Sequence, residues 1–218
     1  MRVGIFDSGR GGEAALRRLT ELAPSVDAVL YCDRENAPYG TKTEEELIKL
    51  VSDDIDRLLS LGAEIILMAC CTASAVYAHL SAERQRIAIP IIEPTSREAL
   101  RVADGKPIGV ICTSASAKMR AFESEIHRLS PKTEVYTLPC QRLVALAEAG
   151  VSDGNITPTA KAEIEGIREY FKDRGIGALI LGCTHFSYFE STLEGAVGTR
   201  VINSAKIGAR ELVRQALQ

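Results

Sequence analysis

IILMACCTAS, residues 65–74, joins a short apolar run to two adjacent cysteines and then to small hydroxyl side chains. Four consecutive apolar residues are typical of a buried strand, and the polar residues after them suit the loop at its end. Similar short apolar runs recur along the chain. They are residues 3–6, 28–31, 87–92, 108–111, 135–138, 178–181 and 201–202. The sequence therefore predicts a series of short buried strands.

Longer stretches with helical periodicity separate these runs. They cover residues 12–22, 43–61, 73–85, 95–103, 115–129, 141–149, 156–174 and 205–217. Strands that alternate with helices predict parallel sheets with helices on both faces, and ligands bind beyond the carboxyl ends of the strands in such sheets. Reactive side chains gather there in this sequence, because Asp7, Cys70 and Cys183 each follow an apolar run.

The chain is predicted to divide into two lobes. A break at residues 90–94 and the return of a helical stretch after Asn203 mark the boundaries. We expect a first lobe of residues 1–92 plus 205–218 and a second lobe of residues 93–204.

The two lobes share a short internal similarity. LMACCT around Cys70 and LILGCT around Cys183 each place a cysteine and then a threonine at a strand end, half a chain apart. This similarity hints at a pseudo-repeat whose halves face one another. The expected fold is therefore an α/β protein with two pseudo-symmetric lobes, each a parallel sheet flanked by helices, and an active site in the cleft between them.

Composition and charge narrow the classes of function. The 218 residues are 46% hydrophobic and carry a formal net charge of -3, with no long run of like charge. This balance gives no reason to propose nucleic acid or a membrane as a partner. The chain runs from Met1 directly into an apolar strand without a signal peptide, and no apolar segment is long enough to span a bilayer. We expect a cytoplasmic protein.

The cysteines and histidines give no sign of a metal site. The six cysteines are scattered and form no Cys-x-x-Cys pair, so they predict reduced thiols rather than a disulfide framework or a zinc knuckle. A P-loop, an H-E-x-x-H motif and the arginine that a cysteine phosphatase places shortly after its nucleophile are all absent from the sequence. We therefore expect neither a metal nor a cofactor.

A glycine-rich turn offers an alternative. Gly9–Ala14 fits G-x-G-x-x-A between a strand and a helix, and Asp33 stands where a dinucleotide-binding protein has a ribose-binding acid. This pattern is typical of a nucleotide-dependent oxidoreductase. However, Asp7 and Ser8 separate the strand from the glycines, and a carboxylate there would lie near the pyrophosphate. A tight strand-to-helix connection is the simpler interpretation.

Two cysteines at two strand ends suit one kind of chemistry. A cysteine hydrolase needs a single thiolate and would leave the second cysteine idle. Stereoinversion uses both, because one thiolate removes a proton from a carbon and the other thiol delivers a proton to the opposite face. His185 lies two residues after Cys183 and can share the proton of that thiol. The alternative is that these cysteines are only small apolar side chains.

Six segments together resemble one known family. They are VGIFDSGRGG (3–12), APYGTK (37–42), MACCTAS (68–74), IGVICTSAS (108–116), ALAEAG (145–150) and LILGCTH (179–185). The sequence is similar to the glutamate racemase branch of the aspartate/glutamate racemase family over nearly its whole length. The resemblance implies two α/β lobes and the interconversion of L- and D-glutamate by two cysteines, without a cofactor, to supply D-glutamate for bacterial peptidoglycan.

The resemblance also implies roles for individual residues. Cys70 and Cys183 match the two thiols that exchange protons with the substrate. Asp7 matches the carboxylate that assists the first thiol, while Glu148 and His185 match the groups that assist the second. The positions expected to bind the amino-acid substrate are Ser8, Pro38, Tyr39, Gly40, Cys71, Thr72, Thr113 and Thr184. Hydroxyl and N–H groups at strand ends can hold carboxylates without adding a competing base.

The residues that depart from the family pattern include Cys71 and Asn203. Cys71 stands where the family ordinarily has an asparagine whose amide helps to bind the substrate, and a thiol is a poorer donor. Asn203 stands where an aspartate is common. Three interpretations stay open: a glutamate racemase, a racemase of another small amino acid such as aspartate, and a paralogue that binds an amino acid without turnover. Family members are often dimers, so a homodimer is also an option.

Overall fold

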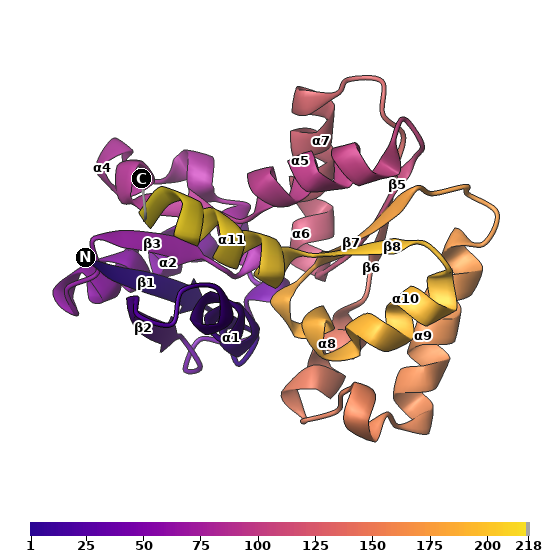
Figure 1. Cartoon of the computed structure of the whole chain (residues 1–218), viewed down its shortest axis with the longest axis horizontal. Helices are drawn as coiled ribbons and strands as arrows, with labels where there is room; N and C mark the ends of the chain where they lie inside the picture. Colours follow the sequence, from indigo (N-terminus) through magenta and orange to yellow (C-terminus); the bar gives the residue numbers. More distant parts are fainter. Residues whose placement is uncertain (217–218) are drawn as a thin grey trace.

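Two parallel sheets form the framework of the protein. The computed structural model describes residues 1–216 and is shown in Figure 1. The first sheet has the order β2-β1-β3-β4 and contains β1 (Arg2–Asp7), β2 (Asp27–Cys32), β3 (Ile65–Met68) and β4 (Ala88–Pro90). The second has the order β6-β5-β7-β8 and contains β5 (Ile108–Cys112), β6 (Val135–Pro139), β7 (Ala178–Gly182) and β8 (Arg200–Asn203).

The two sheets are built alike. All their strand pairs are parallel, and the first strand of each sheet lies between the second and the third. Gly4 of β1 is therefore in register with Val29 of β2 and with Ile66 of β3. The common strand order is the pseudo-symmetry that the sequence predicts, and the predicted fold class is confirmed.

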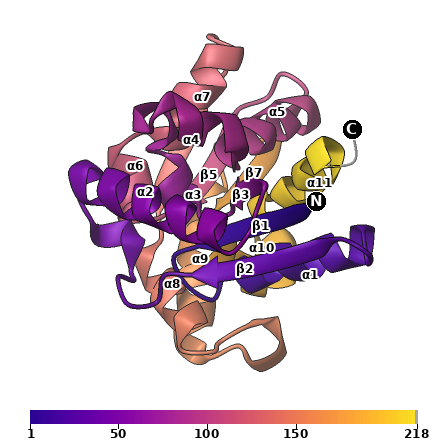
Figure 2. The same cartoon turned by 90° about the vertical axis from the view of Figure 1, so that its left-hand side faces the viewer.

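Helices connect the strands and cover both faces of each sheet (Figures 1 and 2). Up to α5 they are α1 (Gly12–Leu22), η1 (Tyr39–Thr41), α2 (Glu44–Ser60), α3 (Cys71–Ser74), η2 (Tyr77–His79), α4 (Ala82–Ile87) and α5 (Ile92–Ala103), where η marks a 3-10 helix. The others are α6 (Ser114–Lys118), α7 (Ala121–Leu129), α8 (Gln141–Glu148), η3 (Asp153–Asn155), α9 (Pro158–Phe171), η4 (Thr184–Phe189), α10 (Glu190–Val197) and α11 (Ser204–Ala216).

Apolar side chains pack on both faces of the first sheet. Phe6 and Met68 cluster with residues of α2 on one face, whereas Ile5 and Leu67 cluster with residues of α1 and α11 on the other. The second cluster continues into the second sheet through Ile180. This shared core joins the two sheets, and α11 packs against both α1 and α5. The predicted lobe boundaries, residues 1–92 plus 205–218 and residues 93–204, stay a prediction.

Two predicted helices are interrupted, and the prediction of each as continuous is wrong. The stretch 73–85 contains the end of α3, then η2 and the start of α4, because the Ser81 side chain accepts a hydrogen bond from the N–H of Arg84 and begins a new helix. The stretch 115–129 breaks at Arg120, whose φ of 51° lies in the left-handed region and cannot continue a right-handed helix.

Other boundaries differ by a few residues. The helix α5 begins at Ile92, so the apolar run 87–92 contributes only the short strand β4. The sequence did not predict α10, whose single buried side chain is Leu193 and which therefore lacks an apolar stripe. The last residue of the predicted helix 205–217 lies outside the described residues.

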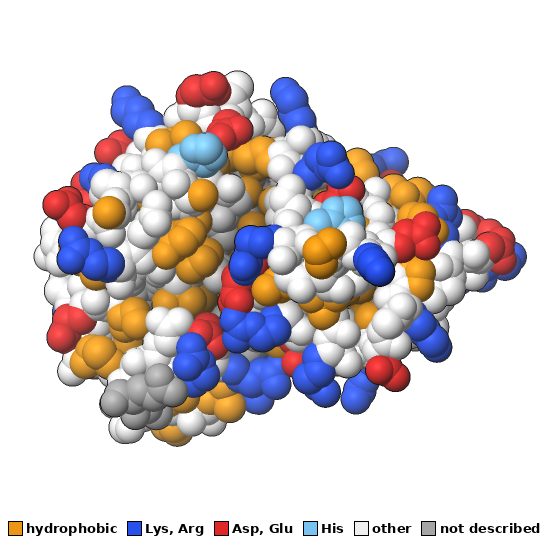
Figure 3. All heavy atoms as spheres, turned by 90° about the horizontal axis from the view of Figure 1, so that it is seen from above, with side chains coloured by type: hydrophobic (Ala, Val, Ile, Leu, Met, Phe, Trp, Pro, Cys, Tyr) orange, Lys and Arg blue, Asp and Glu red, His pale blue; other side chains and the backbone are white. Residues whose placement is uncertain are grey.

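Charged side chains of both signs are mixed on the face that α5 and α7 cover (Figure 3). Many of these charges are paired within one turn of helix, as in Arg101 with Glu98 and Arg128 with Glu125. Within residues 1–216, none of the helices has the length and apolar character that crossing a bilayer requires.

Candidate active site

A cavity of about 500 Å³ lies where the strand ends of the two sheets meet. Its walls come from the loops after β1, β3, β5 and β7, from the segment 37–41 and from α8. The lining residues are Ser8, Ala37, Pro38, Tyr39, Gly40, Thr41, Cys70, Thr72, Thr113, Gln141, Val144, Ala145, Glu148, Cys183 and His185. The structure thus brings both predicted thiols to one cavity, although they are far apart in sequence.

Cys70 follows β3 and precedes α3, so its side chain reaches the cavity from the first sheet. Its Sγ atom lies 3.3 Å from the Oγ atom of Ser8, which follows β1. Burial raises the pKa of Cys70 to about 11, the nearby Asp7 carboxylate adds to the rise, and the Ser8 hydrogen bond opposes it. Cys70 is therefore a neutral thiol at pH 7 whose thiolate, once formed, is a strong base.

Asp7 ends β1 beneath the cavity and is fully buried. Its Oδ1 atom accepts a hydrogen bond of 3.0 Å from the N–H of Gly9, and its Oδ2 atom accepts one of 3.0 Å from the hydroxyl of Thr184. Burial raises the pKa of Asp7 to about 6, while the nearby His185 lowers it. The Thr184 hydrogen bond links the end of β1 to the start of η4 in the other lobe, so Asp7 also connects the two lobes.

Cys183 follows β7 and faces the cavity from the second sheet. Its Sγ atom lies 3.5 Å from the Nδ1 atom of His185. Burial raises the pKa of Cys183, and the nearby Cys71 and Cys70 thiols add to the rise. Both thiols of the cavity are therefore protonated in the substrate-free protein at pH 7.

His185 connects Cys183 to the carboxylate of Glu148. The Nε2 atom of His185 forms a hydrogen bond with the Oε1 atom of Glu148, which also accepts one from the N–H of Arg10. The His185 hydrogen bond lowers the pKa of Glu148, so Glu148 is ionised at neutral pH. A carboxylate on Nε2 favours the tautomer with its proton there, and Nδ1 is then free to accept the proton of Cys183.

Three hydroxyl groups form a bridge across the cavity floor. The Oγ1 atoms of Thr72 and Thr113 lie 2.9 Å apart, and the Oγ atom of Ser116 lies within 3.2 Å of both. Thr72 follows β3 and Thr113 follows β5, so the bridge joins the two lobes. Hydroxyl groups in this position can donate hydrogen bonds to a substrate carboxylate.

The segment 37–41 closes the cavity from the side of the first sheet. Its Ala37–Pro38 peptide bond is cis. Tyr39 lines the cavity, and its hydroxyl is held by two buried carboxyl groups, since it lies 2.6 Å from the Oδ2 atoms of both Asp33 and Asp54. Gly40 lies so close to Thr113 and Gln141 that a Cβ atom there would meet their side chains at under 3.0 Å.

Three predicted site residues are not among those that line the cavity. Asp7 lies below it, and the Thr184 hydroxyl is directed to Asp7. The Cys71 thiol donates a hydrogen bond of 3.3 Å to the Oγ atom of Ser204 and is 1% exposed. Neither Cys71 nor Thr184 lines the cavity, so the substrate contacts expected of them stay predictions.

Sequence reasoning missed one wall of the cavity. Gln141, Val144 and Ala145 line it together with Glu148, and these four residues have the i, i+3, i+4, i+7 spacing of one helix face. Stepping backward from Glu148 by the helical period would have identified all three. Ala37 and Thr41, which flank the predicted Pro38–Gly40 turn, were also missed.

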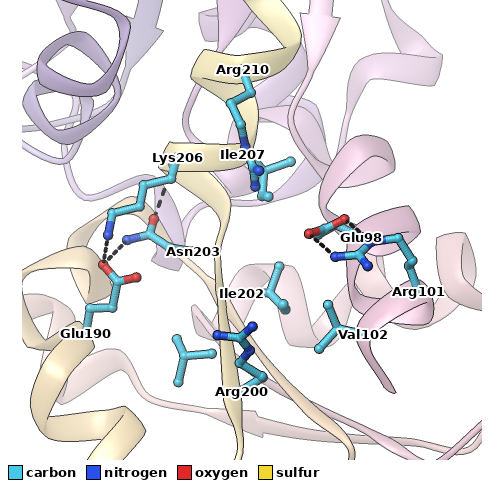
Figure 4. A pocket seen from close by; sticks show the side chains of 11 residues that line it. Glu98, Arg101, Val102, Glu190, Arg200, Ile202, Asn203, Lys206, Ile207 and Arg210 are labelled. Carbon is cyan, nitrogen blue, oxygen red and sulfur yellow. Dashed lines mark hydrogen bonds and ion pairs between the residues drawn. The ribbon is translucent and has the colours of Figure 1, made fainter. Parts of the chain in front are cut away.

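A second cavity of about 210 Å³ lies between α5, β8 and α11 (Figure 4). Asn203, Lys206 and Glu190 lie on one side of it, and Glu98 and Arg101 lie on the other. None of the predicted site residues lines it. Neither cavity holds a metal-binding cluster, since residues 1–216 contain no group of three or more His, Cys, Asp and Glu side chains that could hold a metal ion.

The fold and the site define a two-lobed α/β protein with two buried thiols in one cavity between its sheets. The family model for Asp/Glu/Hydantoin racemase matches residues 10–212, and the chain belongs to this family, as predicted.

Relatives and solved structures agree with this assignment. The chain is 35% identical to the glutamate racemase of Desulforudis audaxviator, over 92% of this chain and 72% of that one. It is 35% identical to the glutamate racemase of Aquifex aeolicus, over 97% and 82% of the two chains. The structure resembles the glutamate racemase of Francisella tularensis in complex with D-glutamate, with a TM-score of 0.88, 28% identity and coverage of 99% and 81%.

Proposed function

We propose that this protein interconverts L- and D-glutamate by direct proton transfer, without a cofactor, and supplies D-glutamate for peptidoglycan. The observation that carries the proposal is the placement of Cys70 and Cys183 in the walls of one cavity, one at a strand end of each sheet. Racemisation needs a base and an acid on opposite faces of one carbon, and two facing strand ends provide this arrangement.

Because both thiols are protonated in the substrate-free protein, the reaction begins when Cys183 passes its proton to Nδ1 of His185. The Cys183 thiolate then removes the α-proton, and the Cys70 thiol donates a proton to the opposite face. The first cysteine then carries the proton taken from the substrate, the second is a thiolate, and the two exchange roles in the reverse direction. His185 takes the proton of Cys183 through Nδ1, and Glu148 stabilises the imidazolium that results. The negative charge of Asp7 beside Cys70 makes that thiolate a stronger base.

The substrate is held by the polar groups of the cavity wall. The hydroxyls of Ser8, Thr72 and Thr113 donate hydrogen bonds to its carboxylates, and the segment 37–41 and the α8 face of Gln141 and Val144 enclose it. Fixed donors in a site that excludes water stabilise the charge that develops when the α-proton leaves. The Cys71 thiol is directed to Ser204 and adds no hydrogen bond to this clamp, so the test below includes amino acids other than glutamate.

Hydrogen exchange in deuterated water tests the proposal. We expect each enantiomer of glutamate to yield the other with deuterium at the α-carbon, at a rate well above that for aspartate and other amino acids. Cys70→Ala and Cys183→Ala should each abolish racemisation, whereas the matched control Cys140→Ala, whose thiol lies on the Leu138 carbonyl, should retain it. Racemisation that survives loss of either cavity thiol would exclude the two-thiol mechanism, and exchange with aspartate alone would reassign the substrate.

Assembly, location and lobe division belong to the same proposal. We place the enzyme in the cytoplasm, as a homodimer that needs neither nucleic acid nor a membrane. We assign residues 1–92 plus 205–218 to the first lobe and residues 93–204 to the second. Light scattering during size-exclusion chromatography would measure the mass, and a single 23.6 kDa species would exclude the dimer. Cell fractionation would test the location.

A further inference from the structure

A buried tyrosine lies between two buried carboxyl groups next to the active-site cavity. The hydroxyl oxygen of Tyr39 is 2.6 Å from Oδ2 of Asp33 and 2.6 Å from Oδ2 of Asp54. The three side chains are 1%, 4% and 4% exposed. They come from η1, from the residue after β2 and from α2, so the cluster joins three separate segments.

The two short contacts require a proton beyond the one that the tyrosine carries. A hydroxyl group donates a single hydrogen bond, yet each 2.6 Å oxygen–oxygen contact needs a hydrogen between its atoms. Burial and the hydrogen bonds to both carboxyl groups raise the pKa of Tyr39, so the phenol keeps its own proton. One of the two carboxyl groups is therefore a neutral carboxylic acid.

The hydrogen bonds of each carboxyl group identify the neutral one. The Oδ1 atom of Asp33 accepts hydrogen bonds from the backbone N–H of Asn36 at 3.4 Å and from its Nδ2 atom at 3.1 Å. Donors of this kind stabilise a carboxylate. Within residues 1–216, the Asp54 carboxyl group has a hydrogen bond only to Tyr39. Asp54 therefore carries the extra proton and donates it to the Tyr39 oxygen, and Tyr39 donates to the Asp33 carboxylate.

Tyr39 lies in the segment that forms the cavity wall. The residues on either side of it, Pro38 and Gly40, line the cavity, and Gly40 packs directly against Thr113 and Gln141 of the other lobe. The Tyr39 ring also packs on Phe6 of β1 with 6.1 Å between centroids. A movement of the tyrosine would therefore shift the wall and the contact between the lobes.

We propose that Asp54 is a positioning residue for this enzyme: as a neutral carboxylic acid it holds Tyr39 in place, and through Tyr39 it holds the segment 37–41 in the form that binds the substrate. The racemase activity on which this inference rests is the proposed function above. Asp54 does not line the cavity, and its effect on the reaction passes entirely through Tyr39.

Loss of the Asp54 proton would weaken this arrangement. Burial raises the pKa of Asp54 to about 7, the Tyr39 hydrogen bond lowers it, and Asp33 and Asp53 raise it further. On the neighbouring strand β2, Tyr31 faces the same carboxyl groups, and Arg57 on α2 faces Tyr31. Above its pKa, Asp54 presents a second carboxylate to a hydroxyl that can donate to only one, so Tyr39 loses a hydrogen bond and the two carboxylates repel each other.

The pH dependence of KM for glutamate tests the proposal with the full-length enzyme. Asn at position 54 can donate to the Tyr39 oxygen at every pH. One unit above a pKa of about 7, only about one molecule in ten keeps the proton, so KM of the original enzyme rises by up to about tenfold. We therefore expect the ratio of its KM to that of Asp54→Asn to rise by up to about tenfold between pH 6 and pH 8. The control is Asp173→Asn, which changes an exposed aspartate just after α9 and should keep the KM of the original enzyme at both pH values.

Other readouts separate a failure of this inference from a failure of the proposed function. A KM ratio that stays constant with pH would overturn the positioning role. If Asp54→Asn does not fold, Tyr39→Phe replaces it in the test. The KM of Tyr39→Phe should exceed that of the original enzyme at pH 6 and approach it at pH 8. If the KM values of the two proteins change with pH in parallel, the proposal is overturned. If no amino acid is racemised, infrared difference spectra between the original protein and Asp54→Asn still decide, because the signal of Asp7 is common to both proteins. A protonated-carboxyl band that is present in this difference at pH 6 and lost at pH 8 supports the proton assignment, and a difference spectrum without the band refutes it.

Discussion

The Nδ1 atom of His185 lies 3.5 Å from the Sγ atom of Cys183, and the Nε2 atom of the same ring is hydrogen-bonded to Glu148. One imidazole thus joins a buried thiol to a carboxylate whose side chain is 42% exposed. Cys183 can therefore release its proton to His185, and the Glu148 carboxylate at the edge of the cavity stabilises the imidazolium that forms. The strand end of the other sheet has a different arrangement, because Cys70 after β3 contacts the Ser8 hydroxyl and has only the Asp7 charge nearby.

Replacing His185 by asparagine should lower kcat/KM by about 100-fold, the lower end of the usual contribution of general acid–base catalysis. The loss must be equal in both directions, since the two enantiomers have equal free energy. Polarimetry from pure L- and pure D-glutamate would measure it. His127→Asn is the matched control, because His127 contacts the Thr133 carbonyl and does not line the cavity. An unchanged kcat/KM in His185→Asn would remove the imidazole from the mechanism.

The buried carboxylate of Asp7 should make the protein less stable as the pH rises. Its pKa is 3.8 in the unfolded chain and about 6 in the folded protein. Between these values the folded protein binds more protons than the unfolded chain, so the free energy of unfolding falls with rising pH by about 3 kcal/mol and is level above pH 6.

Asp7→Asn removes this pH dependence. The free energy of unfolding of Asp7→Asn relative to the original protein should therefore rise by up to about 3 kcal/mol between pH 4 and pH 7, while racemase activity falls. Urea unfolding at several pH values would measure the difference. A constant difference across this range would mean that Asp7 titrates alike in the folded and unfolded states.

The strands were predictable from sequence because each contains a short, largely apolar run. The central strands β5 and β7 are buried throughout, whereas the residues of the edge strands β2 and β6 are at most partly buried. The run 178–181, for example, lies within β7, whose residues are all buried. The helix boundaries depend on local hydrogen bonds and backbone angles that periodicity does not report. The cap at Ser81 and the left-handed Arg120 are two such cases, and each interrupts a stretch that reads as one helix.

The site was predictable where residues lie at strand ends and less so elsewhere. Cys70 and Cys183 stand out because parallel strands bring their carboxyl ends together. Glu148 ends α8 and Tyr39 begins η1, away from the strand ends, and only the family resemblance singled them out. The direction of a side chain cannot be read from sequence, and the Cys71 thiol, next to Cys70 in the chain, points to Ser204 instead of the cavity.

Gly40 and Gly166 should respond in opposite ways to the same substitution. A Cβ atom at Gly40 would lie 2.8 Å from the Cβ atom of Thr113, so Gly40→Ala should push the lobes apart, raise KM and lower the free energy of unfolding by about 1–3 kcal/mol. Gly166 lies inside α9 with no atom within 4 Å of such a Cβ, so Gly166→Ala should stabilise the protein by about 0.5–1 kcal/mol. Equal effects on KM would show that the contact at Gly40 does not shape the cavity.

Cys71→Asn introduces the residue that the family ordinarily has at this position. Because the Cys71 side chain is buried against Ser204, we expect an unchanged KM for glutamate and a free energy of unfolding lower by about 1–3 kcal/mol, from the larger polar group in a packed site. Cys71→Ser, which keeps a donor to Ser204, is the control and should cost less. A lower KM in Cys71→Asn would show instead that residue 71 reaches the substrate.

Asn203→Asp tests a second departure from the family. The Nδ2 atom of Asn203 donates a hydrogen bond of 2.8 Å to Oε2 of Glu190, which also pairs with Lys206 (Figure 4). An aspartate has no donor and would place a second carboxylate at this distance, so the free energy of unfolding at pH 7 should fall by about 1–3 kcal/mol.

Adding Glu190→Gln should restore much of that loss, because a glutamine side chain can donate to the new aspartate. Chemical denaturation of the two single variants and the double variant gives their interaction energy. Additive effects would mean that Asn203 and Glu190 do not depend on each other. A large interaction energy between positions 203 and 190 would instead explain why this chain has an asparagine at position 203. Because Glu190 is paired with Lys206, residue 203 must donate a hydrogen bond to Glu190, and an aspartate at 203 would need a different residue at position 190 of α10.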